Sequence, residues 1–148
     1  MFSVNKIKKV ASLAGVQEVD SFESKLIESL PNEYRQFLEQ YNGGKPSKYF
    51  HRSGQVIRYF FALTDETIYS LEYHYQIYTL AKRMPENMLP IATDFGGNCF
   101  CISVGGPDKG KIYFWDHDGE TSGYDNLDLL EESFLKFVEE LEDEPDYI

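Results

Sequence analysis

The richest group of polar side chains in the sequence is Asp116-His117-Asp118-Gly119-Glu120. Three carboxylates and an imidazole are ligands that a divalent cation could use. The spacing lacks the acid at position twelve of a calcium-binding loop, and Asp118-Gly119 is a strong signal for a hairpin turn. We therefore interpret this segment as a turn at the end of a strand and predict no metal site.

A second segment, Asp94-Phe95-Gly96-Gly97-Asn98, could suggest a phosphate-binding loop because of its paired glycines. Such a loop needs a lysine and a hydroxyl residue where a helix begins, whereas this segment leads into an apolar strand. A tight turn is the better interpretation. We expect the Asp94 carboxylate to accept hydrogen bonds from backbone amides within that turn.

Candidates for catalysis are missing from the sequence. The three histidines share no local motif, and no Ser or Cys stands at a spacing that supplies both a base and an orienting acid. Cys99 and Cys101 point to one side of an extended strand, but there is no second cysteine pair to complete a zinc site. We expect two reduced core cysteines, and we predict no catalytic residue, no cofactor and no enzyme activity.

Tyrosines gather in the segment Thr67–Arg83, which we predict to be one long amphipathic helix. A helix of this kind usually provides a half-exposed packing face. If its tyrosines are exposed, they suit a protein interface, where Tyr is over-represented. The residues that we expect to contact a partner are Tyr69, Tyr73, Asp116, Asp118 and Glu120.

The charge of the chain limits its partners. The formal net charge is −11, and phosphate binding requires Lys and Arg, so nucleic acid and anionic membranes are poor ligands. A basic protein would be attracted and steered to this surface. The alternative is that the acidity only keeps a small domain in solution. We expect a monomer or a weak homodimer.

A chain of 148 residues fits a single domain, residues 1–148, whose acidic end, residues 142–148, we expect to fray. No apolar run approaches the roughly 18 residues that a membrane span needs. The first ten residues contain lysines but no apolar block after them, so they do not resemble a signal peptide. We expect a cytoplasmic protein.

Hydrophobic spacing and turn signals predict helices first, strands in the middle and a helix last, which is an α+β domain with a mainly antiparallel sheet flanked by helices. The predicted helices are Phe22–Leu30, Asn32–Tyr41, Thr67–Arg83 and Leu130–Leu141, with a weak one before Gly15. The predicted strands include Val56–Phe61, Met88–Ala92, Asn98–Val104 and Lys111–Trp115. The predicted core contains Tyr34, Phe37, Leu38, Ile91, Phe100, Ile102 and Phe134.

The most informative stretch is the helix that follows Leu30-Pro31. Tyr34, Phe37, Leu38 and Tyr41 form one apolar face, and Asn42-Gly43-Gly44 ends the helix. This order of residues resembles the signature of the SUKH superfamily, which includes the fungal Smi/Knr regulators and many bacterial immunity proteins.

Two further motifs follow in the same order as in that superfamily. Leu89-Pro90-Ile91-Ala92 precedes the Asp94 turn and an apolar strand, and Ser133-Phe134 lies near the end of the chain. Motif residues with a structural role are Leu30, Pro31, Tyr34, Phe37, Leu38, Asn42, Gly43, Gly44, Pro90, Ile91, Asp94, Gly97 and Asn98.

The resemblance implies a SUKH-like fold, a central sheet with helices packed around it, and a binding function. Many bacterial members neutralise a cognate toxin, often a nuclease, and an acidic protein can cover the basic groove of such an enzyme. A regulatory scaffold domain like the fungal members is the alternative. An uncharacterised enzyme is a more distant one.

Overall fold

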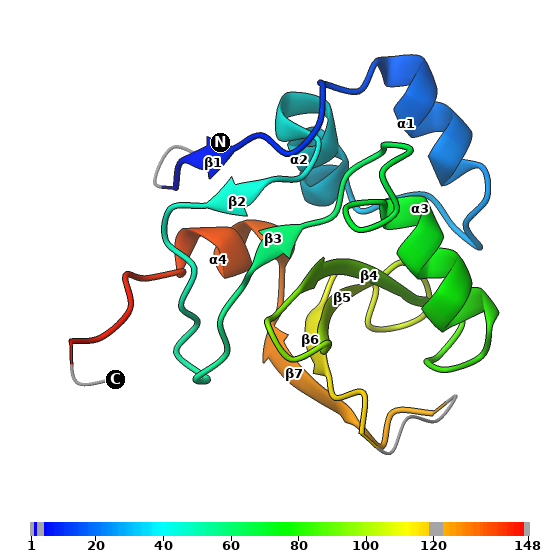
Figure 1. Cartoon of the computed structure of the whole chain (residues 1–148). Helices are drawn as coiled ribbons and strands as arrows, with labels where there is room; N and C mark the ends of the chain where they lie inside the picture. The colour runs from blue at the N-terminus through cyan, green and yellow to red at the C-terminus, as the bar shows by residue number, and fades with distance from the viewer. Residues whose placement is uncertain (1, 3–4, 119–122, 147–148) are drawn as a thin grey trace.

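The computed structural model describes residue 2, residues 5–118 and residues 123–146. A five-stranded antiparallel sheet of order β3-β4-β5-β6-β7 lies at its centre, and a two-stranded sheet, β1-β2, lies beside α2 (Figure 1). The strands are β1 Ile7–Lys8, β2 Lys45–Pro46, β3 Tyr59–Phe60, β4 Met88–Thr93, β5 Cys99–Ser103, β6 Ile112–Trp115 and β7 Leu127–Glu131. The helices are α1 Val16–Glu23, α2 Asn32–Tyr41, α3 Leu71–His74, the π-helix η1 Tyr75–Leu80 and α4 Phe134–Glu139.

The predicted α+β class with a mainly antiparallel sheet is confirmed, and the predicted strands fall within one sheet as β3, β4, β5 and β6. Short turns explain the antiparallel pairing of β4 with β5 and of β5 with β6, because a short turn returns the chain beside the strand it has left. Within the described residues, every helix is too short or too polar to cross a bilayer.

Helix α2 has the predicted bounds, and its end is a junction of three chain segments. Asn42 takes the left-handed conformation, with φ of 52°. Its side-chain amide donates to the carbonyl oxygens of Ser12 and Leu63, at 2.8 and 3.0 Å, and its side-chain oxygen accepts from the Leu63 amide at 2.8 Å. A buried amide with three hydrogen bonds thus fixes the segments before α1 and after β3 against the end of α2.

The two glycines after Asn42 are required by close backbone contacts. Gly43 has φ of 75°, and a Cβ atom there would lie 2.4 Å from the Phe61 carbonyl oxygen. At Gly44, with φ of 124°, a Cβ atom would lie 2.6 Å from the Lys8 carbonyl oxygen. Only glycine combines these conformations with contacts this short, which explains the motif in physical terms.

One face of the sheet packs against α2 and α4 and forms the main core. All seven residues predicted for the core are buried there. Phe37 of α2 is in its middle, with its ring centre 4.9 Å from that of Phe60 and 5.1 Å from that of Phe134. Edge-to-face and tilted ring contacts dominate this core, as the aromatic composition predicts.

The opposite face of the sheet has a smaller core, which contains Met84, Met88, Cys99, Cys101, Tyr113 and Trp115. Both cysteines are free and buried, as predicted. Burial raises the pKa of each thiol, so the thiols stay protonated near neutral pH and act as small apolar groups.

The prediction of a helix over Phe22–Leu30 is wrong, because α1 ends at Glu23. The Glu23 carboxylate accepts a hydrogen bond from the Leu30 amide at 2.7 Å and so closes a loop where the helix was expected to continue. Leu30 is still buried, but it reaches the core from an extended segment. The regular spacing of apolar residues was therefore correct about burial and misleading about conformation.

The long helix predicted over Thr67–Arg83 is also shorter than expected. It begins at Leu71 as α3 and continues as η1 to Leu80. The backbone of Ala62 bonds to the carbonyl of Tyr69 and to the amide of Leu71, each at 2.7 Å, so the residues before α3 pair with the chain that leaves β3. These bonds occupy backbone groups that a longer helix would need.

Both ends of the chain contain strands where helices were predicted. The segment before Gly15 contains β1, which pairs with β2. The first residues of the helix predicted over Leu130–Leu141 belong to β7, which pairs with β6, and the observed helix α4 is shorter than predicted. Ser133 then starts α4, and its side chain accepts a hydrogen bond from the Lys136 amide. In the acidic tail, the Glu142 backbone pairs with Phe50.

The central position of Phe37 leads to a stability prediction. Phe37→Ala should lower the free energy of unfolding by about 3–5 kcal/mol, the usual cost of removing a buried aromatic ring. Urea unfolding followed by circular dichroism measures this loss. Val16→Ala, at a side chain that is 58% exposed, is the control and should change the free energy by less than about 0.5 kcal/mol. A loss near zero for Phe37→Ala would contradict the packing described here.

Candidate protein-interaction surface

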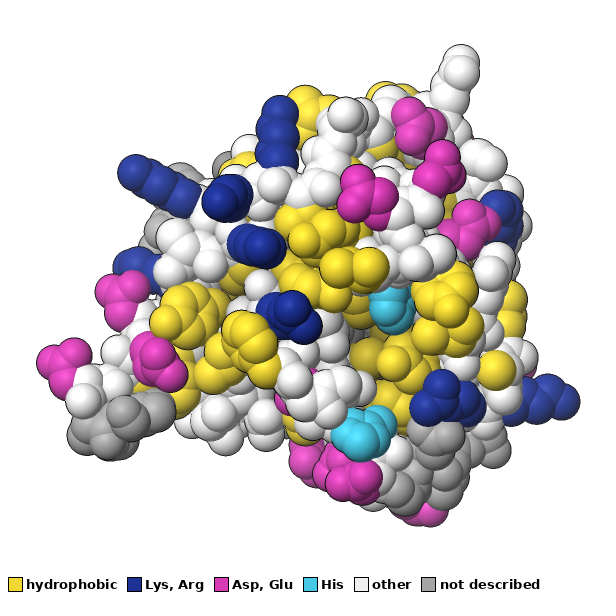
Figure 2. Space-filling view, viewed as in Figure 1, with side chains coloured by type: hydrophobic (Ala, Val, Ile, Leu, Met, Phe, Trp, Pro, Cys, Tyr) yellow, Lys and Arg dark blue, Asp and Glu magenta, His cyan; other side chains and the backbone are white. Residues whose placement is uncertain are grey.

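A chain of touching rings runs along the side of the molecule that carries α3, η1 and the start of β4. We call it the aromatic track. Its members are Tyr59, Phe61, Tyr69, Tyr73, His74, Tyr78 and Trp115. Figure 2 shows hydrophobic side chains with interspersed basic ones across this face.

The rings make continuous contact from β3 to β6. Phe61 and His74 are stacked with ring centres 3.9 Å apart, and His74 lies 6.1 Å from Tyr78. Tyr78 in turn lies 5.1 Å from Trp115. At the other end, Tyr59 lies 5.9 Å from Phe61. Rings that are fixed by their neighbours lose little conformational entropy when a partner binds them.

Helix α3 and η1 position the middle of the aromatic track. The Ser70 side chain accepts a hydrogen bond from the Tyr73 amide at 3.0 Å and so starts α3. His74 Nδ1 donates to the Ser70 carbonyl oxygen at 2.6 Å, since a carbonyl can only accept. Thr79 of η1 donates to the Met88 carbonyl of β4 at 2.7 Å, which holds the helix against the sheet.

Two of the predicted contact residues belong to the aromatic track. Tyr73 is 40% exposed at its surface. Tyr69 is half-buried, with its ring centre 4.9 Å from that of Tyr59. The structure thus places both tyrosines on one surface, while their role in binding stays a prediction.

Arginines lie on the aromatic track or at its edge, although the chain as a whole is acidic. The guanidinium of Arg58 lies 5.6 Å from the ring centre of Tyr59 and 5.3 Å from that of Phe95. Arg83 lies 4.7 Å from the ring centre of Tyr78. Phe95 is 72% exposed, the most exposed of the large hydrophobic side chains in the described residues. Tyr, Trp and Arg are the residue types enriched at binding hot spots.

The predicted acidic contacts lie where β6 ends. Asp116 follows Trp115, the last ring of the aromatic track, and its side chain accepts a hydrogen bond from the Asp118 amide at 2.9 Å. The Asp118 side chain is 87% exposed. The hydrogen bond between these two residues agrees with the predicted turn, while Gly119 and Glu120 lie outside the described residues. In the described part of the chain, no group of three His, Cys, Asp or Glu residues is arranged to hold a metal ion.

The Asp94 turn also has the predicted structure. The Asp94 carboxylate accepts hydrogen bonds from the amides of Gly96 and Asn98, at 2.8 and 2.9 Å, and from the Asn98 side chain. Asn98 in turn accepts a hydrogen bond from the His117 amide at 3.0 Å. This chain of bonds fixes the acidic segment after β6 beside the β4–β5 hairpin.

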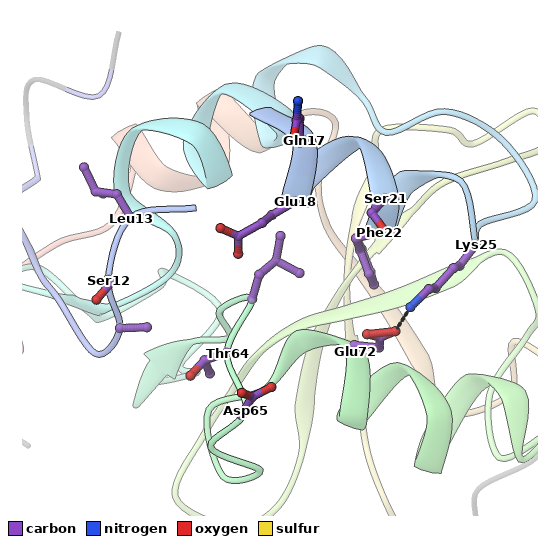
Figure 3. Close-up of a pocket in the computed structure, with 12 residues that line it drawn as sticks. Ser12, Leu13, Gln17, Glu18, Ser21, Phe22, Lys25, Thr64, Asp65 and Glu72 are labelled. Carbon is purple, nitrogen blue, oxygen red and sulfur yellow. Dashed lines mark hydrogen bonds and ion pairs between the residues drawn. The ribbon is translucent and has the colours of Figure 1, made fainter. Parts of the chain in front are cut away.

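A groove of about 560 Å³ lies on the other side of α3, between α1 and the segment after β3 (Figure 3). Glu72 lines this groove, and the next residue, Tyr73, belongs to the aromatic track, so the two surfaces meet on α3. No pattern in the sequence indicates the groove, because its walls come from segments about 50 residues apart, such as those around Gln17 and Thr64.

The fold and its motifs agree with a known class of α+β domains. A sequence model of the SMI1 / KNR4 family (SUKH-1) matches residues 14–140. The match includes helix α2 with the Asn42-Gly43-Gly44 segment after it, the Asp94 turn and the segment that begins α4. The chain therefore belongs to this family, as the motifs predicted.

The chain is also similar to a bacterial protein. The chain is 30% identical to the SPbeta prophage-derived uncharacterized protein YokK of Bacillus subtilis (strain 168), over 151 aligned positions. The alignment covers 87% of this chain and 75% of the relative.

The stacked position of His74 predicts a pH dependence of stability. Burial lowers the pKa of His74, and the hydrogen bond to the Ser70 carbonyl offsets only part of this effect. Below its ordinary pKa of about 6.5, the unfolded chain therefore binds more protons than the folded one, and stability is lost as the pH falls.

We expect His74→Asn to lose less stability than the native chain between about pH 7 and pH 5, because the substitution removes the group that titrates in this window. Urea unfolding at several pH values measures both curves. The free energy of unfolding of the variant is lower at pH 7, since the ring contacts are lost. The prediction concerns the slope of this free energy against pH. Parallel curves for the two proteins would contradict the assignment.

Proposed function

We propose that this chain is a non-enzymatic binding protein that neutralises a cognate toxin, a basic protein, by covering its working surface. The observation that carries the proposal is the aromatic track, a fixed row of rings with an exposed tyrosine, followed at its Trp115 end by the exposed carboxylates of Asp116 and Asp118. Membership of the SMI1 / KNR4 family supports a binding role, because many bacterial members of the superfamily are immunity proteins.

The charge of the chain supports the choice of a basic partner. With a formal net charge of −11, the protein attracts a cationic surface, such as the substrate groove of a nuclease, at long range. Because Arg58 and Arg83 lie against rings of the aromatic track, the proposal assigns this attraction to the carboxylates around the track and not to the rings themselves. The division of roles is that acids around the track accelerate the encounter and the rings provide short-range affinity.

Co-expression tests the proposal. Each protein encoded by the genes next to this one is expressed in a bacterial host, alone and together with this chain. The proposal expects one of them to stop growth alone, to bind the purified chain, and to be harmless in its presence. If a neighbour binds but is not toxic, the regulatory scaffold is the better function. If no neighbour is toxic or bound, the immunity role is wrong.

The first prediction about the complex concerns the exposed ring. Tyr73→Ala should accelerate dissociation from the partner about tenfold to thirtyfold, which corresponds to a typical aromatic hot spot of about 1.5–2 kcal/mol. Surface plasmon resonance measures the rate. Leu129→Ala is a matched control, because Leu129 is an exposed apolar residue on β7 and not a member of the aromatic track. Equal effects of the two changes would exclude the track as the contact surface.

The second prediction concerns association. The association rate should fall steeply as salt rises, because charges separated by more than about 8 Å are screened at physiological ionic strength. Asp118→Lys should slow association without changing the urea midpoint, since this side chain is 87% exposed. Stopped-flow mixing at several salt concentrations measures the rate. An association rate that is indifferent to salt would contradict the electrostatic part of the proposal.

A further inference from the structure

The groove beside α1 has a composition that points to one kind of occupant. Its walls are α1, the residues that precede it, the segment after β3 and the first turn of α3. Figure 3 shows the Glu18 and Asp65 side chains on opposite walls, with Lys25 and Glu72 together at one end.

The charges of this groove do not balance. Three carboxylates line it, and the only cation among the lining residues is Lys25, which forms an ion pair with Glu72. Glu18 accepts a weak hydrogen bond from the Gly15 amide at 3.4 Å, through one of its two oxygens. Asp65 has no hydrogen bond or ion pair with any other residue that the structure describes. Two carboxylates therefore face the groove without a cation.

The remaining lining explains how a long side chain could lie between these carboxylates. Phe22, Leu63 and Leu13 supply apolar surface, and Phe22 and Leu63 belong to or pack against the main core. An arginine or lysine side chain has this same division, with an apolar stem and a charged end. The apolar surface along the groove suits the stem of such a side chain, and the carboxylates on the two walls suit its charged end.

We propose that the groove binds an arginine side chain of the partner protein, with its guanidinium between Glu18 and Asp65 and its stem along the apolar lining. The proposal rests on the proposed function, because it identifies the basic group that the partner presents. Arginine fits better than lysine, since the planar guanidinium has five donors and can bind carboxylates on two sides at once. The groove is then the point where the charge of the partner is recognised, next to the rings that provide affinity.

A peptide titration tests this site without the toxin. The probe is acetyl-Gly-Arg-Gly-amide, added to the full chain labelled with ¹⁵N, and the control is the same peptide with citrulline, which has the same shape but no charge. We expect saturable shifts of the backbone amides from Gln17 to Phe22 and from Leu63 to Asp65. The citrulline peptide should bind at least about fivefold more weakly, the upper range for one exposed ion pair.

Two double variants of equal charge test the residues. Glu18→Gln with Asp65→Asn should weaken binding of the arginine peptide about fivefold or more, since each lost ion pair at the surface contributes up to about 1 kcal/mol. Asp125→Asn with Asp128→Asn removes the same charge from exposed residues outside the groove and should leave binding unchanged. Both variants change exposed side chains, and the dispersion of their amide spectra reports whether they fold.

Three results would overturn the site: equal binding of the arginine and citrulline peptides, shifts that map outside the groove, or equal effects of the two double variants. None of these results bears on toxin neutralisation, which the co-expression experiment measures separately. Conversely, a chain that binds the arginine peptide but rescues no host would retain the site and lose the immunity role.

Discussion

The three hydrogen bonds of the Asn42 side chain determine where both candidate surfaces lie. One of these bonds reaches Ser12, which lines the groove, and two reach Leu63, which also lines it. Phe61, whose carbonyl oxygen lies against Gly43, is the ring on which His74 stacks. The Asn-Gly-Gly sequence that ends α2 therefore does more than stop a helix. It sets the backbone positions from which the groove and the aromatic track are built.

The two faces of the sheet differ in what packs against them, and only one of them leaves aromatic rings at the surface. The face under α2 and α4 is a closed aromatic core, while the other face is covered by short elements that leave ring edges at the surface. Trp115 and Phe61 are buried and hold the outer rings in place, and Tyr73 extends to the solvent. A binding surface anchored in this way is formed before the partner arrives, so little free energy is lost in ordering it.

Sequence reasoning worked where a local signal and the tertiary fold agree. Pro31 and Asn42 mark the two ends of helix α2 in the sequence, and Asp94 marks the turn of the β4–β5 hairpin. It failed where a distant partner decides the conformation. The apolar residues of Leu127–Glu131 fit a helix as well as a strand, and pairing with β6 selects the strand. The tyrosines of the surface were found by their residue type, whereas the groove was missed because no spacing connects its walls.

The π-helix that carries Tyr78 has a consequence for the divergence of related chains. A π-turn is equivalent to an α-helix with one extra residue, so a deletion of one residue in η1 restores ordinary helical geometry. Such a deletion leaves Tyr73 in the same orientation relative to Thr79, which is bonded to β4, because the π-turn has already absorbed the rotation of about 100° that one residue adds to an α-helix. The length of this segment can therefore differ by one residue between related chains while the exposed ring, the sheet and the main core keep their positions. Only the residues within the π-turn itself change the direction of their side chains.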